Sequence, residues 1–423
     1  MSGLTREEVS SELDQASSLE SEPQVSTAEL LEFGSKHLLG NYRQAPMVLV
    51  KGSGCFVEDS EQKRYLDFAA GVAVNALGHS HPKLVQAISE QAATLMHVSN
   101  YFFNQQNLML AAELTAATGF SRAFFCNSGG EANEAMLKLA RRYQHNRGKK
   151  EKLRFIAFEN SFHGRTFATV NLTGTASYRE GFGEFPGVTH VPYGDLDAVK
   201  RVLSDDVCGI FVEPVQGEGG VLPAPAGFLQ GLRELCDEQQ ALLLVDEVQT
   251  GIGRTGTVLG LEHSGVRADV VTLAKGLGGG FPIGAMLVRE ELSNVLTPGT
   301  HGSTFGGNAL ASRAARVVLE VLLMVTLFAS YVCSAMAMRY FSHAGFVMSM
   351  PVAAPERQAL SPMAKEYVKR AGLLYSWALR FFLIIAPLVV GVVRPIGMPF
   401  MAVALVVALW FFDRPAKAAA GAA

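Results

Sequence analysis

The chain has 423 residues, which is enough for two or more domains that each bury their own hydrophobic core. Its formal net charge of −3 excludes a strongly basic protein that attracts nucleic acid by bulk charge, so we expect no nucleic-acid partner. The charge is unevenly distributed, because residues 321–423 hold 9 of the 36 basic residues but only 3 of the 39 acidic ones. This asymmetry predicts an acidic soluble part followed by a part suited to a bilayer.

Residues 1–28 are acidic, rich in serine and poor in large apolar side chains. We expect them to form a disordered tail, because such a composition cannot bury enough apolar surface to fold. The five cysteines have no CxxC pair and no neighbouring histidine cluster. They predict free thiols in a reducing cytoplasm and no metal site.

From residue 42 onward, short apolar runs alternate with helix-like stretches. Val48–Val50 and Cys55–Val57 flank Lys51–Gly54, as in a β-hairpin. Further strand-like runs lie at Ala123–Asn127, Phe155–Phe158, Cys208–Val212, Leu242–Val245, Val270–Leu273 and Ile283–Val288. Apolar residues at helical spacing occur between them, as in Glu131–His145 and Gly227–Gln240. The alternation predicts an α/β fold with a mostly parallel sheet flanked by helices.

Chemically capable side chains follow several of these runs. Ser128, Glu213, Asp246 and Lys275 each come directly after an apolar stretch. The carboxyl ends of parallel strands meet at one edge of a sheet, where ligands bind. The sequence therefore predicts that these four residues surround a common site.

Three of these positions allow both a functional and an ordinary interpretation. A lysine such as Lys275, after a buried strand and before glycines, can act as nucleophile and base, but it can also be a surface residue. The Asp246 carboxylate is costly to bury unless a cation meets it, although it can also cap the next element. Ser128, Gly129 and Gly130 expose backbone N–H groups to an anion, but they also suit any strand-to-helix turn.

Near residue 320 the composition changes to long apolar runs. Candidate membrane spans cover residues 321–338, 373–393 and 395–412, each near the length needed to cross a hydrocarbon core of about 30 Å. We expect residues 321–412 to form a membrane-like region and 413–423 a tail. Residues 339–370 would form a loop between spans. Its basic bias belongs on the cytoplasmic side, so either the first run does not fully span or two gene fragments have been fused.

Seven motifs occur in order between residues 42 and 320. They read AsnAlaLeuGlyHisSerHisPro at 75–82, AsnSerGlyGlyGluAlaAsnGlu at 127–134, SerPheHisGlyArgThr at 161–166, GluProValGlnGlyGluGlyGly at 213–220, AspGluValGln at 246–249, Lys275 with its glycines, and HisGlySerThrPheGlyGlyAsn at 301–308. With these motifs the segment resembles the class III (ornithine-type) aminotransferases, and most closely their acetylornithine group. The resemblance implies pyridoxal 5′-phosphate (PLP) as cofactor and, over residues 29–320, the large domain of a fold type I PLP-dependent transferase.

The resemblance also implies roles for the residues around the cofactor. Lys275 would hold the cofactor covalently, Asp246 would pair with its pyridine nitrogen, and Gln249 would reach its ring hydroxyl. Phe162 would stack on the ring. The phosphate would be received at a helix start by Ser128, Gly129 and Gly130. The family usually has Thr or Ala at position 130, so one side-chain contact to the phosphate is expected to be lost.

Four further residues would serve the substrate and a second subunit. Arg165 would hold the substrate carboxylate through a bidentate contact. Ser303 and Thr304 would reach the cofactor and substrate of a neighbouring subunit, which implies a homodimer with shared sites. Glu218 resembles the family's gate, a carboxylate that neutralises an arginine of the C-terminal small domain. We expect that small domain to be missing and replaced by the hydrophobic helices.

The C-terminal region adds a second, weaker resemblance. Residues 367–413 loosely resemble an uncharacterised family of small bacterial inner-membrane proteins, through TyrSerTrpAlaLeuArg at 375–380 and TrpPhePheAsp at 410–413. We therefore expect a cytoplasmic enzyme domain that is tethered to the inner membrane.

The first functional hypothesis is transfer of an amino group from N-acetylornithine to 2-oxoglutarate, giving N-acetylglutamate semialdehyde and glutamate in arginine biosynthesis. A second hypothesis is a membrane-anchored pseudo-enzyme, or a gene-fusion product, without turnover. A third keeps the transaminase but changes the donor to ornithine, 4-aminobutyrate or succinylornithine.

Overall fold

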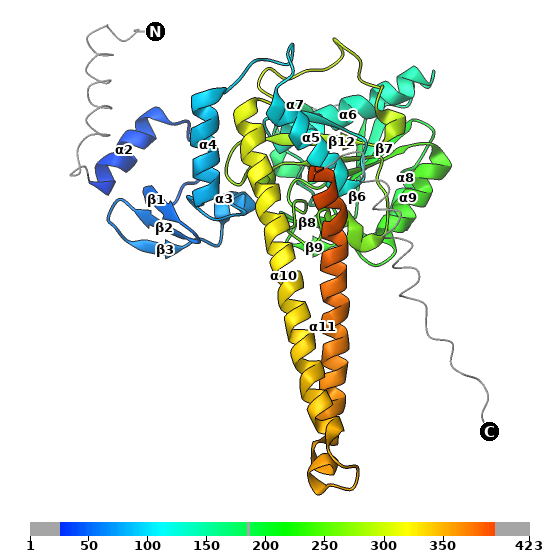
Figure 1. The fold of residues 1–423 in the computed structure, drawn as a ribbon. Helices are drawn as coiled ribbons and strands as arrows, with labels where there is room; N and C mark the ends of the chain where they lie inside the picture. The colour runs from blue at the N-terminus through cyan, green and yellow to red at the C-terminus, as the bar shows by residue number, and fades with distance from the viewer. Residues whose placement is uncertain (1–25, 184–186, 394–423) are drawn as a thin grey trace.

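The computed structural model describes residues 26–183 and 187–393, and Figure 1 shows an α/β body from which a long helical hairpin projects. Most of the predicted tail 1–28 and the whole candidate span 395–412 lie outside the described residues. The N-terminal part comprises α2 (Thr27–His37) and an antiparallel sheet of β1 (Leu49–Ser53), β2 (Phe56–Asp59) and β3 (Arg64–Leu66). The β1–β2 pair is the hairpin predicted from the two apolar runs.

A seven-stranded sheet forms the centre of the body, in the order β4-β12-β11-β10-β7-β5-β6. Its strands are β4 (Arg122–Cys126), β5 (Arg154–Phe158), β6 (Val188–Val191), β7 (Val207–Val212), β10 (Leu242–Asp246), β11 (Val270–Leu273) and β12 (Gly284–Val288). Strand β12 runs antiparallel to both neighbours, whereas the strands from β11 to β6 pair in parallel. The mostly parallel sheet is thus confirmed, and only β6, with its polar Thr189 and His190, was not predicted.

Two hydrophobic clusters explain why the central strands are apolar at most positions. All residues of β7, β10, β11 and β12 are buried. Successive side chains of a strand point to opposite faces. Leu243 and Val245 accordingly join one cluster, with helix α9, and Leu242 and Leu244 join the other, with helix α6. Both faces of the sheet are therefore covered, as continuous apolar runs predict.

Short elements complete the body. The helices are α3 (Ala70–Ala73), α4 (Pro82–Thr94), α5 (Gln105–Thr118), α6 (Gly129–Asn146), α7 (Phe167–Leu172), α8 (Leu196–Val202) and α9 (Phe228–Gln239). The 3₁₀ turns are η1 (Ala176–Tyr178), η2 (Gly260–Ser264), η3 (Lys275–Gly278) and η4 (Glu290–Leu292), and β8 (Val215–Gln216) pairs with β9 (Leu222–Pro223).

The chain leaves the body through α10 (Ala309–Ser349), a helix of 41 residues, and returns through α11 (Pro355–Val393). At 1.5 Å per residue, α10 is about 60 Å long. Its first turns are buried in the body, and the rest forms the hairpin seen in Figure 1. The boundary predicted at residue 320 therefore falls inside one continuous helix.

The segment 339–370, expected to connect two spans, is helical for most of its length. Both helices run through this stretch, and only residues 350–354 form the turn between them. Charged residues such as Lys369 and Arg370 lie on the exposed surface of a helix. They are therefore compatible with a continuous helix. The prolines at 351 and 355, which cannot continue a preceding helix, mark the turn instead.

Small side chains form the contact between the two hairpin helices. The buried residues at seven-residue spacing are Ser330, Ala337 and Ala344 on α10 and Ala364, Ala371 and Ala378 on α11. The Ser330 hydroxyl donates a hydrogen bond of 2.9 Å to the Ala378 carbonyl. By length and composition, α10 is the one helix in the described part of the chain that is long and apolar enough to cross a membrane. Span 373–393, predicted separately, is the second half of α11.

Candidate active site

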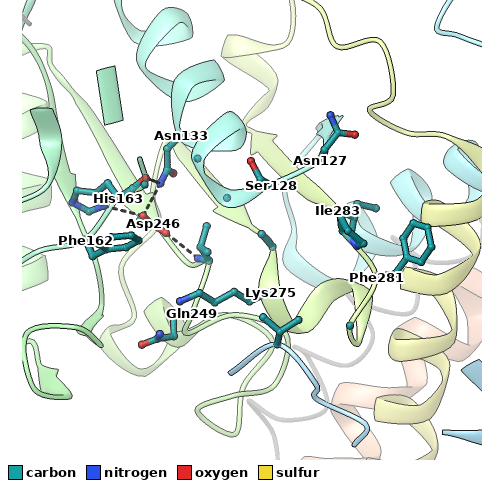
Figure 2. A pocket seen from close by; sticks show the side chains of 18 residues that line it. Asn127, Ser128, Asn133, Phe162, His163, Asp246, Gln249, Lys275, Phe281 and Ile283 are labelled. Carbon is teal, nitrogen blue, oxygen red and sulfur yellow. Dashed lines mark hydrogen bonds and ion pairs between the residues drawn. The ribbon is translucent and has the colours of Figure 1, made fainter. Parts of the chain in front are cut away.

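A cavity of about 350 Å³ opens at the carboxyl edge of the sheet, where the predicted residues were expected to meet. Figure 2 shows the side chains around it. Predicted residues that line it are Ser128, Gly129, Gly130, Phe162, Asp246, Gln249 and Lys275. Arg165, Glu218, Ser303 and Thr304 do not line this cavity. The structure thus brings the cofactor residues together and leaves the substrate and second-subunit residues outside.

One end of the cavity is the N-terminus of α6. Ser128 caps this helix, and its hydroxyl accepts the Glu131 N–H at 3.2 Å. Gly129 and Gly130 occupy the first helical positions, where N–H groups have no acceptor within the helix. A Cβ at Gly129 would lie 2.7 Å from Val248, so no side chain fits there. Two N–H groups at a glycine-lined helix start provide an anion site.

At the opposite end, Asp246 presents a buried carboxylate that is held by N–H donors. It accepts the Val248 N–H at 2.9 Å, the Asn133 side-chain amide at 2.7 Å and His163 Nδ1 at 2.8 Å. Within the described residues no lysine or arginine forms an ion pair with it. A buried carboxylate in this state is suited to a cationic ligand atom at the cavity.

Two of these donors, Asn133 and His163, were not assigned a role from the sequence. Asn133 donates to Asp246 and to the His163 carbonyl, and its own oxygen accepts the Thr272 hydroxyl at 2.7 Å. Both residues lie within recognised motifs, and the helical spacing of Asn133 from the apolar Met136 and Leu137 was a usable signal that it is buried. His163 Nδ1 points to Asp246, whereas its buried Nε2 has no partner among the described residues.

Lys275 begins η3, immediately beyond β11, with a backbone φ of 37°. This left-handed conformation is costly for a residue with a side chain, and such strain concentrates at functional sites. Burial lowers the pKa of its amine below the usual 10.5, although the carboxylates of Asp246, Glu218 and Glu213 act in the opposite direction. The environment therefore increases the fraction of neutral, nucleophilic amine relative to a lysine in water.

Glu213 is a second buried carboxyl near the cavity. It accepts the backbone N–H of Phe162 at 3.2 Å. Burial, reinforced by the charge of Asp246, raises its pKa well above its usual value. Burial and the charge of Asp246 therefore both disfavour the ionised form of Glu213. The sequence had placed Glu213 at the site without a role.

Gln249 depends on a glycine opposite it. A Cβ at Gly217 would lie only 1.4 Å from the Gln249 side-chain oxygen. Gly217 is therefore required for this amide to reach the cavity, beside Lys275 as Figure 2 shows.

Arg165 lies on the segment between Phe162 and α7 and is exposed. Its guanidinium carbon is 3.7 Å from the centre of the Tyr178 ring and 5.5 Å from that of Phe162. It forms no ion pair with any described residue. A guanidinium held by aromatic faces keeps its N–H groups free for a carboxylate.

The other predicted residues lie near the cavity but outside it. Glu218 is exposed on the turn between β8 and β9. The Ser303 hydroxyl accepts N–H groups from Asn127 at 3.3 Å and from Gly306 at 3.0 Å, and Thr304 is exposed. Neither serves the cavity of its own subunit, and their predicted roles across a dimer interface remain predictions.

The cavity fits PLP on the geometry of the chain itself. It offers a helix start for a phosphate, a buried carboxylate without a lysine or arginine partner for a protonated pyridine nitrogen, and a lysine whose amine pKa is lowered by burial. Its volume is within the range of small-molecule sites.

Sequence comparisons agree with this arrangement. The family profile "Aminotransferase class-III" matches residues 39–332, and the profile "Protein of unknown function, DUF599" matches residues 292–418. Acetylornithine aminotransferase of Myxococcus xanthus is 55% identical over 306 residues, which cover 72% of this chain and 76% of that protein. Succinylornithine transaminase of Salmonella typhimurium is 52% identical over 282 residues, covering 66% and 69% respectively.

Solved structures lead to the same family. Ornithine aminotransferase of Toxoplasma gondii aligns with a TM-score of 0.70 at 32% identity over 80% of both chains. Acetylornithine aminotransferase of Elizabethkingia anophelis aligns with a TM-score of 0.63 at 34% identity, over 76% of this chain and 80% of that one. The chain therefore belongs to the class III aminotransferases, which are PLP-dependent enzymes.

Proposed function

We propose that this transaminase moves the amino group of N-acetylornithine to 2-oxoglutarate, producing N-acetylglutamate semialdehyde and glutamate. The observation that carries the proposal is the free guanidinium of Arg165, stacked on Tyr178 beside a cavity that contains Lys275 and Asp246. A donor of this type carries a carboxylate at one end and an amine at the other. The 55% identity to the Myxococcus xanthus acetylornithine aminotransferase supports the choice of donor.

When bound, PLP supplies an electron sink for the carbon that carries the amino group. The Asp246 carboxylate, oriented by Asn133 and His163, holds a proton on the pyridine nitrogen. The neutral Lys275 Nζ takes and returns the proton of the reacting carbon. Arg165 binds the carboxylate of the donor and then that of 2-oxoglutarate through two parallel hydrogen bonds.

A homodimer completes the proposed site. Large apolar side chains stand exposed on the body near the cavity segments, among them Tyr101 at 93%, Phe103 at 86% and Phe305 at 59%. An exposed cluster of this kind indicates a protein interface. A second copy covering it would bring the exposed Thr304 and the adjacent Ser303 to the partner's cavity.

The helical hairpin bears on where in the cell the protein is located. We propose that the enzyme body is cytoplasmic and that α10 and α11 tether it to the inner membrane. Apolar side chains such as Phe328, Tyr331 and Phe346 are exposed on α10. In water these side chains would form a long uncovered apolar surface, whereas in lipid they face a medium of their own polarity.

An alternative without turnover rests on the same hairpin. Beyond Ala309 the described residues form only two helices, and among the described residues Glu218 forms no ion pair with an arginine. If the small domain is replaced by this hairpin, the gate has no partner and the protein is a membrane-anchored pseudo-enzyme or a fusion product.

A donor panel separates these functions. Purified protein loaded with PLP is assayed with 2-oxoglutarate and equal concentrations of N-acetylornithine, N-succinylornithine, ornithine or 4-aminobutyrate. We expect the highest kcat/KM with N-acetylornithine. A higher kcat/KM for another donor would identify that donor as the substrate. Normal absorbance of the lysine-bound cofactor near the visible edge, without turnover of any donor, would favour the pseudo-enzyme. Membrane fractionation of the same cells tests the tether, which a fully soluble chain would exclude.

A further inference from the structure

Glu134, on the second turn of α6, makes two hydrogen bonds outside its own helix. Its Oε1 accepts the Thr166 hydroxyl at 2.6 Å and the Ala168 backbone N–H at 3.1 Å. Both donors lie directly after Arg165 in the chain. Hydrogen bonds to a carboxylate are stronger than neutral ones, so Glu134 fixes the end of the segment that carries Arg165.

The same helix holds the start of this segment. The side chain of Asn133 donates a 2.8 Å hydrogen bond to the His163 carbonyl. Gly164 follows with a φ of 129°, and a Cβ there would lie 3.0 Å from the Gly130 Cα. The backbone around Arg165 is thus pressed against the start of α6 and held on both sides by adjacent residues of that helix.

The arrangement leaves the Arg165 side chain free while its backbone is fixed. Thr166 is the N-cap of α7, but its own side chain does not cap that helix, and Glu134 accepts the α7 N–H group instead. The first turn of α6 presents Gly129 and Gly130 to the proposed phosphate position. Helix α6 therefore sets the distance between the proposed phosphate position and the Arg165 guanidinium.

We propose that Glu134 is a positioning residue that sets the distance between the cofactor phosphate and the donor carboxylate, and so selects the length of the amino donor. The proposal rests on the proposed function, because it takes Arg165 as the carboxylate-binding residue. Glu134 does not line the cavity, and it forms no ion pair with Arg165. It acts on the segment 163–168 through the Thr166 hydroxyl and the Ala168 backbone N–H.

The test compares Glu134→Ala with Glu134→Gln, whose amide oxygen still accepts both hydrogen bonds. For Glu134→Ala we expect KM for N-acetylornithine to rise about tenfold, as expected for the loss of about 1.4 kcal/mol of binding, with kcat within about threefold. Glu134→Gln should stay within about threefold of the wild type in both constants. Thr166→Val, which removes one donor, should give an intermediate KM. Glu234→Ala, an exposed glutamate on α9, is the matched control and should change nothing.

Two readouts do not depend on turnover. Hydrogen exchange of the Ala168 amide should accelerate about tenfold in Glu134→Ala, since a lost bond of about 1.4 kcal/mol corresponds to that factor. Calorimetric affinity for glutarate, a dicarboxylate without an amine, should fall in the same variant while visible-edge absorbance stays unchanged. If Arg165→Ala retains glutarate affinity, the proposed role of Arg165 fails. If Arg165→Ala loses affinity but Glu134→Ala keeps normal KM, affinity and exchange, the positioning role is overturned.

Discussion

The α/β body and the helical hairpin bury opposite kinds of side chain. In the body the largest fully buried residues include Phe155, Phe158 and Phe211, and the buried carboxylate of Asp246 is held by hydrogen bonds. In the hairpin the buried contact consists mainly of alanines, and the large apolar side chains point outward. A body folded in water hides apolar volume, whereas helices in lipid bring their small faces together. The two regions therefore differ in the kind of side chain that they bury, as the proposed membrane tether requires.

The regions are joined without a linker. Val317 and Val318 are buried in the body, and Ala337 is buried in the hairpin, within the same helix. Val318 lies 3.0 Å from the position of a Cβ at Gly279, close to η3 and Lys275. Changes confined to one region therefore test whether each region depends on the other.

Lys275→Ala should have the largest effect. Removing the nucleophilic amine should lower kcat by about 10³-fold or more and abolish the visible-edge absorbance, because no other described lysine lines the cavity. The measurement is steady-state kinetics with absorbance spectra. Membrane fractionation of the variant should match the wild type, since the hairpin is unchanged. Retained absorbance would show that the cofactor is held elsewhere.

Ala337→Leu should change the hairpin alone. Ala337 is 1% exposed, so three added carbons overpack the contact and destabilise it by about 1–3 kcal/mol. Hydrogen exchange of α10 amides in detergent should then accelerate, with normal cofactor absorbance. The neighbouring Met338→Leu, at a side chain that is 64% exposed, is the control and should shift stability by less than about 0.5 kcal/mol. Equal effects of both changes would contradict the alanine contact.

The rate at which PLP attaches to Lys275 should depend on pH, because the surroundings of Lys275 in the α/β body shift the pKa of its amine. Burial lowers the pKa of Lys275, so the neutral amine increases with pH through a range below 10.5. The attachment rate at saturating PLP should rise about tenfold per pH unit below this pKa and then level off. Glu218→Gln removes a charge that raises the pKa and should shift the curve to lower pH. A curve that Glu218→Gln moves to higher pH would contradict this environment.

Part of the candidate site could be predicted from the sequence. Seven of the predicted residues line one cavity. Ser128, Gly129, Gly130, Asp246 and Lys275 were predicted because apolar runs mark buried strands and chemically active residues follow strand ends, whereas Phe162 and Gln249 were predicted from the family resemblance alone. Asn133 and His163 were missed as partners of Asp246, because such contacts join residues far apart in the sequence. Their geometry depends on how α6 packs on the sheet.

The hairpin was predicted less well for a different physical reason. Apolar composition indicates a bilayer-like segment, but it does not locate the turn between helices. The charged residues between 339 and 370 suggested a loop, although charges are compatible with exposed helix faces. The seven-residue spacing of Ala337 and Ala344 was the available signal for a helix pair.

Gly130→Thr should have the smallest effect. Whether PLP affinity rises or falls shows whether a glycine is required at position 130 or can be replaced. A Cβ at Gly130 would meet Thr166 at 3.5 Å, an ordinary contact, so the side chain fits and its hydroxyl can donate to the proposed phosphate. We expect PLP to bind about threefold more tightly, measured by titration of visible-edge absorbance, because strain offsets part of a hydrogen bond to a charged group. Gly129→Thr is the matched control, since its Cβ would lie 2.7 Å from Val248 and should weaken binding. Weaker binding in both variants would mean that the helix start accepts no side chain, and that the phosphate is held by backbone N–H groups alone.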